Sequence, residues 1–140
     1  GQPSSKTKKG YFYEPTIFTN VKPNMKIAQQ EIFGPTTTLI KINNLHQAIQ
    51  IANNSEYGLS ASIFTNNITN SQLAIKHLET GIVYVNSPTI GAETHLPFGG
   101  VKATGNGTRE AGIEGIHEFS ETKTVYIDYS GKLQKAQGIK

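Results

Sequence analysis

The stretch TTTLIKINNLHQAIQIANNSEYGLSASIFTNNITNSQLAIKHLETGIVYVN, residues 36–86, decides the fold of this chain. Three of its segments are rich in β-branched and aromatic residues and predict strands: 36–42, 59–65 and 81–86. Between them, apolar residues recur at helical spacing, with Asn44 as a helix cap and a capping-box pattern at Thr69–Gln72. This alternation predicts an α/β fold with a mostly parallel sheet and flanking helices.

The flanking residues add shorter elements. Before this stretch, we expect a loop at residues 1–10, a short strand at 15–18 and one or two helical turns within 24–30. After it comes a long Gly/Pro/Thr loop at 87–107, which is typical of a shaped, functional segment. A helix is expected at 109–119, and the alternation at 122–129 predicts a half-buried strand.

The composition excludes several classes of protein. The 140 residues include 36% apolar residues and no cysteine, which excludes disulfide frameworks and thiolate metal sites. The net charge of +3 is spread over scattered lysines, so nucleic-acid binding is not expected. No apolar run approaches a membrane span and no signal peptide opens the chain, so we expect a soluble, cytoplasmic protein. Residue 1 is not Met and is not expected to be the natural start.

The sequence carries little evidence for a metal site, a phosphate-binding loop or a catalytic serine. The four histidines, of which only His95 lies in the long loop, have no ligand spacing, so no metal site is predicted. Gly105-Asn106-Gly107 alone is weak evidence for a phosphate loop, and neither a Walker motif nor a G-x-S-x-G elbow is present.

The turn Glu31–Pro35 (EIFGP) is more informative. A carboxylate on a turn fixed by Gly-Pro can accept hydrogen bonds from vicinal hydroxyls such as those of a ribose. Phe33 offers a flat apolar wall for a ring. Taken alone, these five residues better fit the alternative, an exposed Glu and a core Phe at the start of a strand.

The turn is one of several motifs that resemble, in order and spacing, the NAD(P)-dependent aldehyde dehydrogenase superfamily. They cover essentially the whole chain: Gly10–Phe18, Glu31–Pro35, Asn54–Ala61, Gly81–Asn86, Pro97–Lys102, Gly105–Gly107 and Arg109–Glu110. Their collinear order is far more specific than any single motif. Gly91–Glu93 and Lys135–Ile139 further resemble the branch that oxidises semialdehydes, such as aminoadipate or oxoglutarate semialdehyde.

The resemblance implies that residues 1–120 are the C-terminal part of the catalytic domain of an aldehyde dehydrogenase. Residues 121–140 would be an oligomerisation strand and tail, in which Thr122–Tyr129 pairs with another subunit of a homo-oligomer. An isolated chain would then present an unpaired strand edge.

The resemblance also implies roles for four residues. Glu31 would bind the nicotinamide-side ribose hydroxyls of NAD or NADP, and Phe33 would pack against the nicotinamide. Phe98 would line the substrate tunnel, the alternative being ordinary loop packing. Glu110 matches a carboxylate assigned in some members to a proton relay, the alternative being a carboxylate that the helix dipole favours. Thr108 is a one-residue insertion relative to the commoner Gly-x-Gly-Arg-Glu form.

The family's chemistry uses a Cys nucleophile, a thioester and a Glu general base, and both residues are expected upstream of this chain. We therefore expect one wall of an aldehyde-oxidising site, completed by an upstream part or half-chain, and no activity of the chain alone. The alternative is a non-catalytic, truncated gene product that only self-associates through exposed interface surface.

Overall fold

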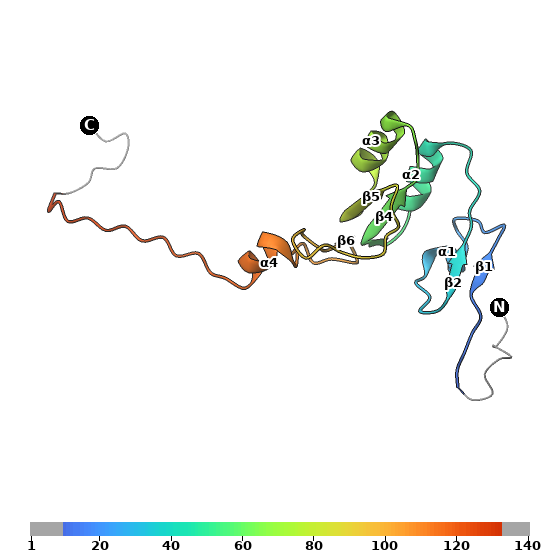
Figure 1. Ribbon diagram of the computed structural model, residues 1–140, viewed down its shortest axis with the longest axis horizontal. Helices are drawn as coiled ribbons and strands as arrows, with labels where there is room; N and C mark the ends of the chain where they lie inside the picture. The colour runs from blue at the N-terminus through green and yellow to red at the C-terminus, as the bar shows by residue number, and fades with distance from the viewer. Residues whose placement is uncertain (1–9, 133–140) are drawn as a thin grey trace.

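The structure is a computed structural model that describes residues 10–132. The elements, in chain order, are β1 (Thr16–Phe18), α1 (Lys26–Gln29), β2 (Thr36–Thr38), α2 (Leu45–Asn53), β3 (Tyr57–Gly58), β4 (Ser60–Ile63), α3 (Ile68–His77), β5 (Ile82–Val85), β6 (Val101–Lys102) and α4 (Gly112–Glu118). Figure 1 shows β1, β2, β4, β5 and the helices α1 to α3 toward one end of the chain, followed by the loop with β6, the short helix α4 and an extended segment that runs away from the rest.

Two β-α-β units confirm the α/β class. β1 pairs with β2 in parallel through α1, with Thr16 opposite Thr36. β4 pairs with β5 in parallel through α3, with Ser60 opposite Ile82. A helix between two strands returns the chain to the same end of the sheet, which is why both pairs are parallel.

The strands do not join into one sheet. They form three two-stranded sheets, β1–β2, β4–β5 and the antiparallel pair β3–β6. The strand predicted at residues 36–42 ends at Thr38; the Leu39 N–H still donates to the Phe18 carbonyl of β1 at 2.8 Å, and the chain then runs to α2. The β3–β6 pair was not predicted, because β6 lies in the Gly/Pro-rich loop and its partner is distant in sequence.

The two longer helices begin with asparagine caps. The Asn44 side chain accepts a hydrogen bond from the Gln47 backbone N–H at 2.9 Å, which confirms the predicted cap of α2. α3 is capped by Asn67, which accepts from the Asn70 backbone N–H at 3.1 Å. The predicted capping box at Thr69 is therefore wrong, because Asn67 supplies an equivalent oxygen two residues earlier and Thr69 already lies in the first turn.

The core is small. Among the described residues, the buried apolar side chains are Val21, 8% exposed, and Ala74 of α3, 1% exposed. The accessible surface of the chain is 11949 Å², whereas a compact monomer of 15.2 kDa exposes about 7,100 Å². Many apolar side chains therefore face solvent in the isolated chain.

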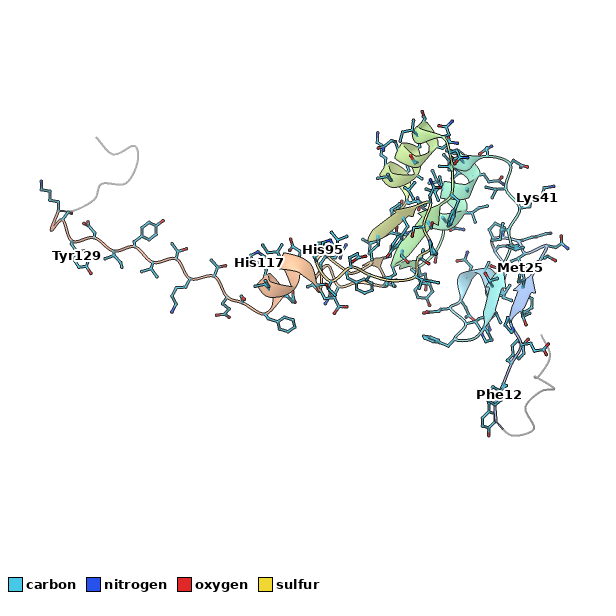
Figure 2. All side chains as sticks on the ribbon, viewed as in Figure 1. Phe12, Met25, Lys41, His95, His117 and Tyr129 are labelled. Carbon is cyan, nitrogen blue, oxygen red and sulfur yellow. The ribbon has the colours of Figure 1, made fainter. Side chains whose placement is uncertain are left out.

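The C-terminal segment differs from the prediction. Residues 122–129 are extended but belong to no strand, because no strand within residues 10–132 pairs with them. Val125 is 66% exposed and Tyr129 93% exposed, and Figure 2 shows Tyr129 far from the folded part. α4 lies inside the predicted helix at 109–119. The residues Lys135–Ile139, quoted for the semialdehyde branch, lie outside the described residues.

The helices of residues 10–132 are too short to cross a bilayer, and α3, the longest of them, has 10 residues.

Candidate functional site

The turn at residues 31–35 follows α1 and is held by backbone hydrogen bonds. Within it, the Gly34 N–H donates to the Ile32 carbonyl at 2.9 Å, and the Thr36 N–H donates to the Gly34 carbonyl at 2.8 Å. The Pro35 carbonyl accepts from the Thr16 N–H at 2.9 Å, which attaches the turn to β1. The turn thus presents its side chains from a backbone that is attached to β1 at its C-terminal end.

The two side chains predicted to bind the cofactor are free to do so. Within the described part of the chain, the Glu31 carboxylate makes no hydrogen bond and no ion pair. Phe33 is 92% exposed, so its ring is not a core residue as the alternative interpretation of this turn required. Glu31 borders an open hollow of about 320 Å³ that also involves Ser55, Leu59 and Thr104.

Phe98 and Glu110 are brought together by the backbone. They form an isolated antiparallel bridge in which the Phe98 N–H donates to the Glu110 carbonyl at 2.6 Å and the Glu110 N–H donates back at 2.8 Å. The Phe98 side chain is half-buried, whereas Glu110 is exposed. Glu110 directly precedes the α4 N-cap Ala111, so it lies near the N-terminal end of this helix, where the dipole favours a carboxylate as the alternative explanation requires.

The hollows beside Glu31 and Glu110 are neighbours. Phe98 and Glu110 border a hollow of about 620 Å³, and its other lining residues include Leu59 and Thr104. These two residues also line the hollow beside Glu31. The Thr104 hydroxyl is fixed, because it accepts a hydrogen bond from the Gly58 N–H at 3.0 Å. Three of the four predicted site residues therefore meet in one region; Phe33 lines neither of these two hollows.

Phe98 also faces a third hollow, of about 360 Å³, with apolar neighbours that include Ile90 and Leu96. One side of this hollow is braced by Tyr84, whose hydroxyl donates to the Gly91 carbonyl at 2.6 Å. An aromatic ring between two hollows, one of them mainly apolar, is a suitable wall for a small organic molecule. A further hollow, about 750 Å³ between α2 and α3, contains none of the predicted site residues.

The sequence comparison decides the family. The family described as "Aldehyde dehydrogenase family" matches residues 1–125. This chain belongs to the aldehyde dehydrogenase family. It is 44% identical over 121 residues to the alpha-ketoglutarate semialdehyde dehydrogenase of Haloferax volcanii, covering 86% of this chain and 25% of that protein. It is 47% identical over 124 residues to aldehyde dehydrogenase 1A1 of Bos taurus, covering 89% of this chain and 24% of the relative.

Solved structures agree with this family. The fold matches an NAD-dependent aldehyde dehydrogenase from Sinorhizobium meliloti with a TM-score of 0.85 and 33% identity, covering 95% of this chain and 26% of that one. It also matches the indole-3-acetaldehyde dehydrogenase AldA of P. syringae in complex with NAD+ and IAA, with a TM-score of 0.79 and 39% identity over 84% and 23% of the two chains. This aldehyde dehydrogenase chain thus spans about a quarter of the length of the relatives it matches.

The residues at the turn fit a nicotinamide nucleotide. An unpaired carboxylate on a fixed turn can accept two hydrogen bonds from the adjacent hydroxyls of a ribose. The open face of Phe33 suits stacking or edge contact with a flat ring. Neither side chain would have to break an existing hydrogen bond or ion pair within the described chain.

The predictions did not include Lys102, whose side chain links the loop between Phe98 and Glu110 to α2 and to Glu79. Lys102 has a left-handed backbone, φ 55°, and its ammonium donates to the Asn53 carbonyl at 2.6 Å. The same group pairs with Glu79 at 2.9 Å. Its place in the Pro97–Lys102 motif was the available signal, but its partners lie far away in sequence.

The residues described by the structure include no group of three or more His, Asp or Glu side chains placed to hold a metal ion.

Proposed function

We propose that this chain forms one wall of the active site of an enzyme that oxidises an aldehyde to a carboxylic acid with NAD+ or NADP+. The supporting observation is that Glu31 and Glu110, distant in sequence, border hollows that share Leu59 and Thr104. Membership of the family supports aldehyde oxidation. Related structures in complex with NAD+ support a nicotinamide cofactor.

In this proposal, each of the four residues has a separate task. Glu31 accepts hydrogen bonds from the nicotinamide-side ribose, and Phe33 packs against the nicotinamide ring. The bound cofactor supplies the hydride acceptor. Phe98 forms part of the substrate wall, and the exposed carboxylate of Glu110, which has no partner within the described residues, takes part in a proton relay toward the general base.

The reactive groups of the proposed mechanism come from outside these 140 residues. The chain contains no cysteine, so it does not supply the thiol that forms the thioester. The general base is likewise assigned to a residue outside the chain. We propose that the wall described here works only when the rest of the site, from an upstream part or half-chain, is assembled against it.

We further propose a semialdehyde as the substrate and a homo-oligomer as the assembly. Relatives named as alpha-ketoglutarate and alpha-ketoglutaric semialdehyde dehydrogenase, 44% and 42% identical, support the substrate class. The exposed apolar residues Val125 and Ile127 support a subunit contact at residues 122–129. The second candidate function, a non-catalytic product that only self-associates, rests on this same exposed apolar surface.

An activity assay on the isolated chain distinguishes both candidate functions from that of an enzyme that is active on its own. We expect the purified 140-residue chain to produce no reduced cofactor when it is supplied with NAD+ or NADP+ and a panel of aldehydes and semialdehydes. The absorbance of the reduced cofactor is the measurement. Turnover by the isolated chain contradicts the assignment of the nucleophile to residues outside it.

A substitution in the full-length protein tests the role of Glu31. Glu31→Gln is expected to raise KM for the cofactor by roughly tenfold or more, because hydrogen bonds to a charged acceptor are worth about 1.5–3 kcal/mol. KM for the aldehyde should change much less. Glu14→Gln, on the exposed segment before β1, is the matched control and should leave both constants unchanged. Equal changes in the two constants would show that Glu31 does not bind the cofactor.

A further inference from the structure

We propose that Asn106 is a site of spontaneous deamidation, at which the chain converts a side-chain amide into aspartate or isoaspartate. Asn106-Gly107 is the one Asn-Gly pair in the sequence. In this reaction, the backbone nitrogen of the following residue attacks the side-chain amide carbon. Glycine favours the attack because it has no Cβ to crowd the ring that forms.

The three reacting groups are arranged for ring closure. In the described chain, the attacking Gly107 N–H makes no hydrogen bond, and the departing Asn106 amide nitrogen donates none. The Asn106 amide oxygen accepts from the Thr108 N–H at 3.0 Å and from the Thr108 hydroxyl at 2.7 Å. These two donors withdraw electron density from the carbon under attack while they leave the nucleophile and the leaving group free.

The surroundings give the reaction room. Asn106 is exposed, and residues 105–108 belong to no helix or strand, so ring closure breaks no ladder of backbone hydrogen bonds. Gly107 has φ +98°, and a Cβ placed on it would meet no atom within 4 Å. Thr108, the inserted residue of this loop, supplies both of the polarising hydrogen bonds.

The reaction needs only water besides the chain. A bond forms between the Gly107 nitrogen and the Asn106 side-chain carbon, the bond to the amide nitrogen breaks, and ammonia leaves with the Gly107 proton. Water then opens the five-membered succinimide at either carbonyl. Opening at one carbonyl gives aspartate at position 106, and opening at the other gives isoaspartate, which lengthens the backbone by one carbon.

In two other asparagines, Asn70 and Asn86, a hydrogen bond holds one of the groups that deamidation requires. The backbone nitrogen after Asn70 belongs to Ser71, which is buried in α3 and donates to the Asn67 carbonyl at 3.1 Å. The Asn86 amide nitrogen donates to the Thr65 carbonyl at 3.0 Å, so its leaving group is held. Both asparagines precede serine, a small residue, and serve as internal controls.

The product places a new charge at the site described above. Asn106 borders the same hollow as Phe98, Glu110 and Glu118, so deamidation adds a third carboxylate residue there. Isoaspartate would also shift the segment that leads to Arg109 and Glu110. The chemical change itself is independent of the proposed function.

The test follows the amide directly in the full-length protein. The native protein is incubated at mildly alkaline pH in water enriched in heavy oxygen, then cleaved with trypsin at mildly acidic pH. Cleavage after Lys102 and Arg109 releases a peptide that contains Asn106 and neither of the control asparagines. We expect this peptide to gain the mass of amide-to-acid conversion, to take up heavy oxygen and to separate into two isomers, while the Asn70 and Asn86 peptides keep their amides.

The comparison with unfolded protein makes the proposal falsifiable. In urea, Asn106 should convert at a rate similar to that in the native protein, because the native structure leaves its reacting groups free. Asn106→Gln should abolish the conversion. Retention of the amide in the native protein with loss in urea overturns the proposal, as does equal conversion at Asn70 and Asn86. Because the readout is chemical, its failure is distinct from a failure of the proposed enzyme activity.

Discussion

The unit formed by α2, β4, α3 and β5 and the C-terminal segment of residues 119–132 both carry apolar side chains at regular spacing. In the first, β4 and β5 pair along their whole length, and α2 and α3 contact each other. No strand of the described chain pairs with the C-terminal segment, and Phe119 and Tyr126 are at least 90% exposed. Both regions thus share regular spacing of apolar residues, but only the first contains the strands and helices that pair with and contact one another.

The difference comes from connectivity. The helix between β4 and β5 returns the chain to the start of a neighbouring strand, so the hydrogen-bond partner of each strand is present in the same molecule. A strand at the end of a chain has no such return, and it must find an edge elsewhere. Three substitutions test this comparison, from the largest expected effect to the smallest.

Gly81→Ala should damage the folded unit most. A Cβ at position 81 would overlap the backbone carbonyl of Gly99, so β5 and the loop that bears Phe98 must move apart. We expect a loss of about 3 kcal/mol in the free energy of unfolding, at the upper end of overpacking costs. Urea denaturation of the full-length protein is the measurement.

Gly34→Ala is the matched control, because its Cβ would meet only an Ile32 methyl at 3.9 Å. A loss at position 81 no larger than that at position 34 would show that the close approach to Gly99 does not matter for stability.

Lys102→Met should have an intermediate effect. It removes the part-buried hydrogen bond to the Asn53 carbonyl and the ion pair with Glu79, whose side chain is 59% exposed and contributes less to the loss. We expect a loss of about 1–2 kcal/mol in the free energy of unfolding. The control, Lys76→Met on the exposed side of α3, should cost much less. Equal losses would contradict the role of Lys102 as a fastener of the loop.

Tyr126→Ser should leave the stability of the folded unit unchanged. Tyr126 is 93% exposed, so it packs little against the part of the chain that the structure describes. The same substitution should weaken self-association if residues 122–129 form a subunit contact, and sedimentation measurements report that change. A decrease in the urea midpoint of the monomeric chain would show that the segment packs on its own chain.

The sequence predicted the elements whose causes are local. Asn44 caps α2 because its oxygen needs only the next helical turn, and β4–α3–β5 follows from apolar spacing. The start of α3 was misplaced because Asn67 and Thr69 offer similar capping oxygens, and the difference between them depends on where the chain arrives from β4. The pairing of Tyr57 with Lys102 depends on two distant segments meeting, which no local pattern records.

The candidate site shows the same difference between local and long-range causes. Glu31, Phe33, Phe98 and Glu110 were predicted from short motifs of consecutive residues, which can be read directly from the sequence. That Phe98 and Glu110 pair through their backbones, and that Thr104 and Leu59 lie between them and Glu31, is tertiary information. The strand at 122–129 was predicted from its alternation of apolar and polar residues. This pattern does not show which strand would pair with it.

The bridge between Phe98 and Glu110 also has a consequence for motion. Its two hydrogen bonds lie between the same two residues, so neither amide can exchange with solvent deuterium unless the other bond is strained as well. The bridge closes the loop from Gly99 to Arg109 at its ends, while the pairing of β6 with β3 and the contacts of Lys102 hold its middle. When the bridge opens, the Phe98 ring and the Glu110 carboxylate are released together, so access to this wall depends on one local opening event instead of two.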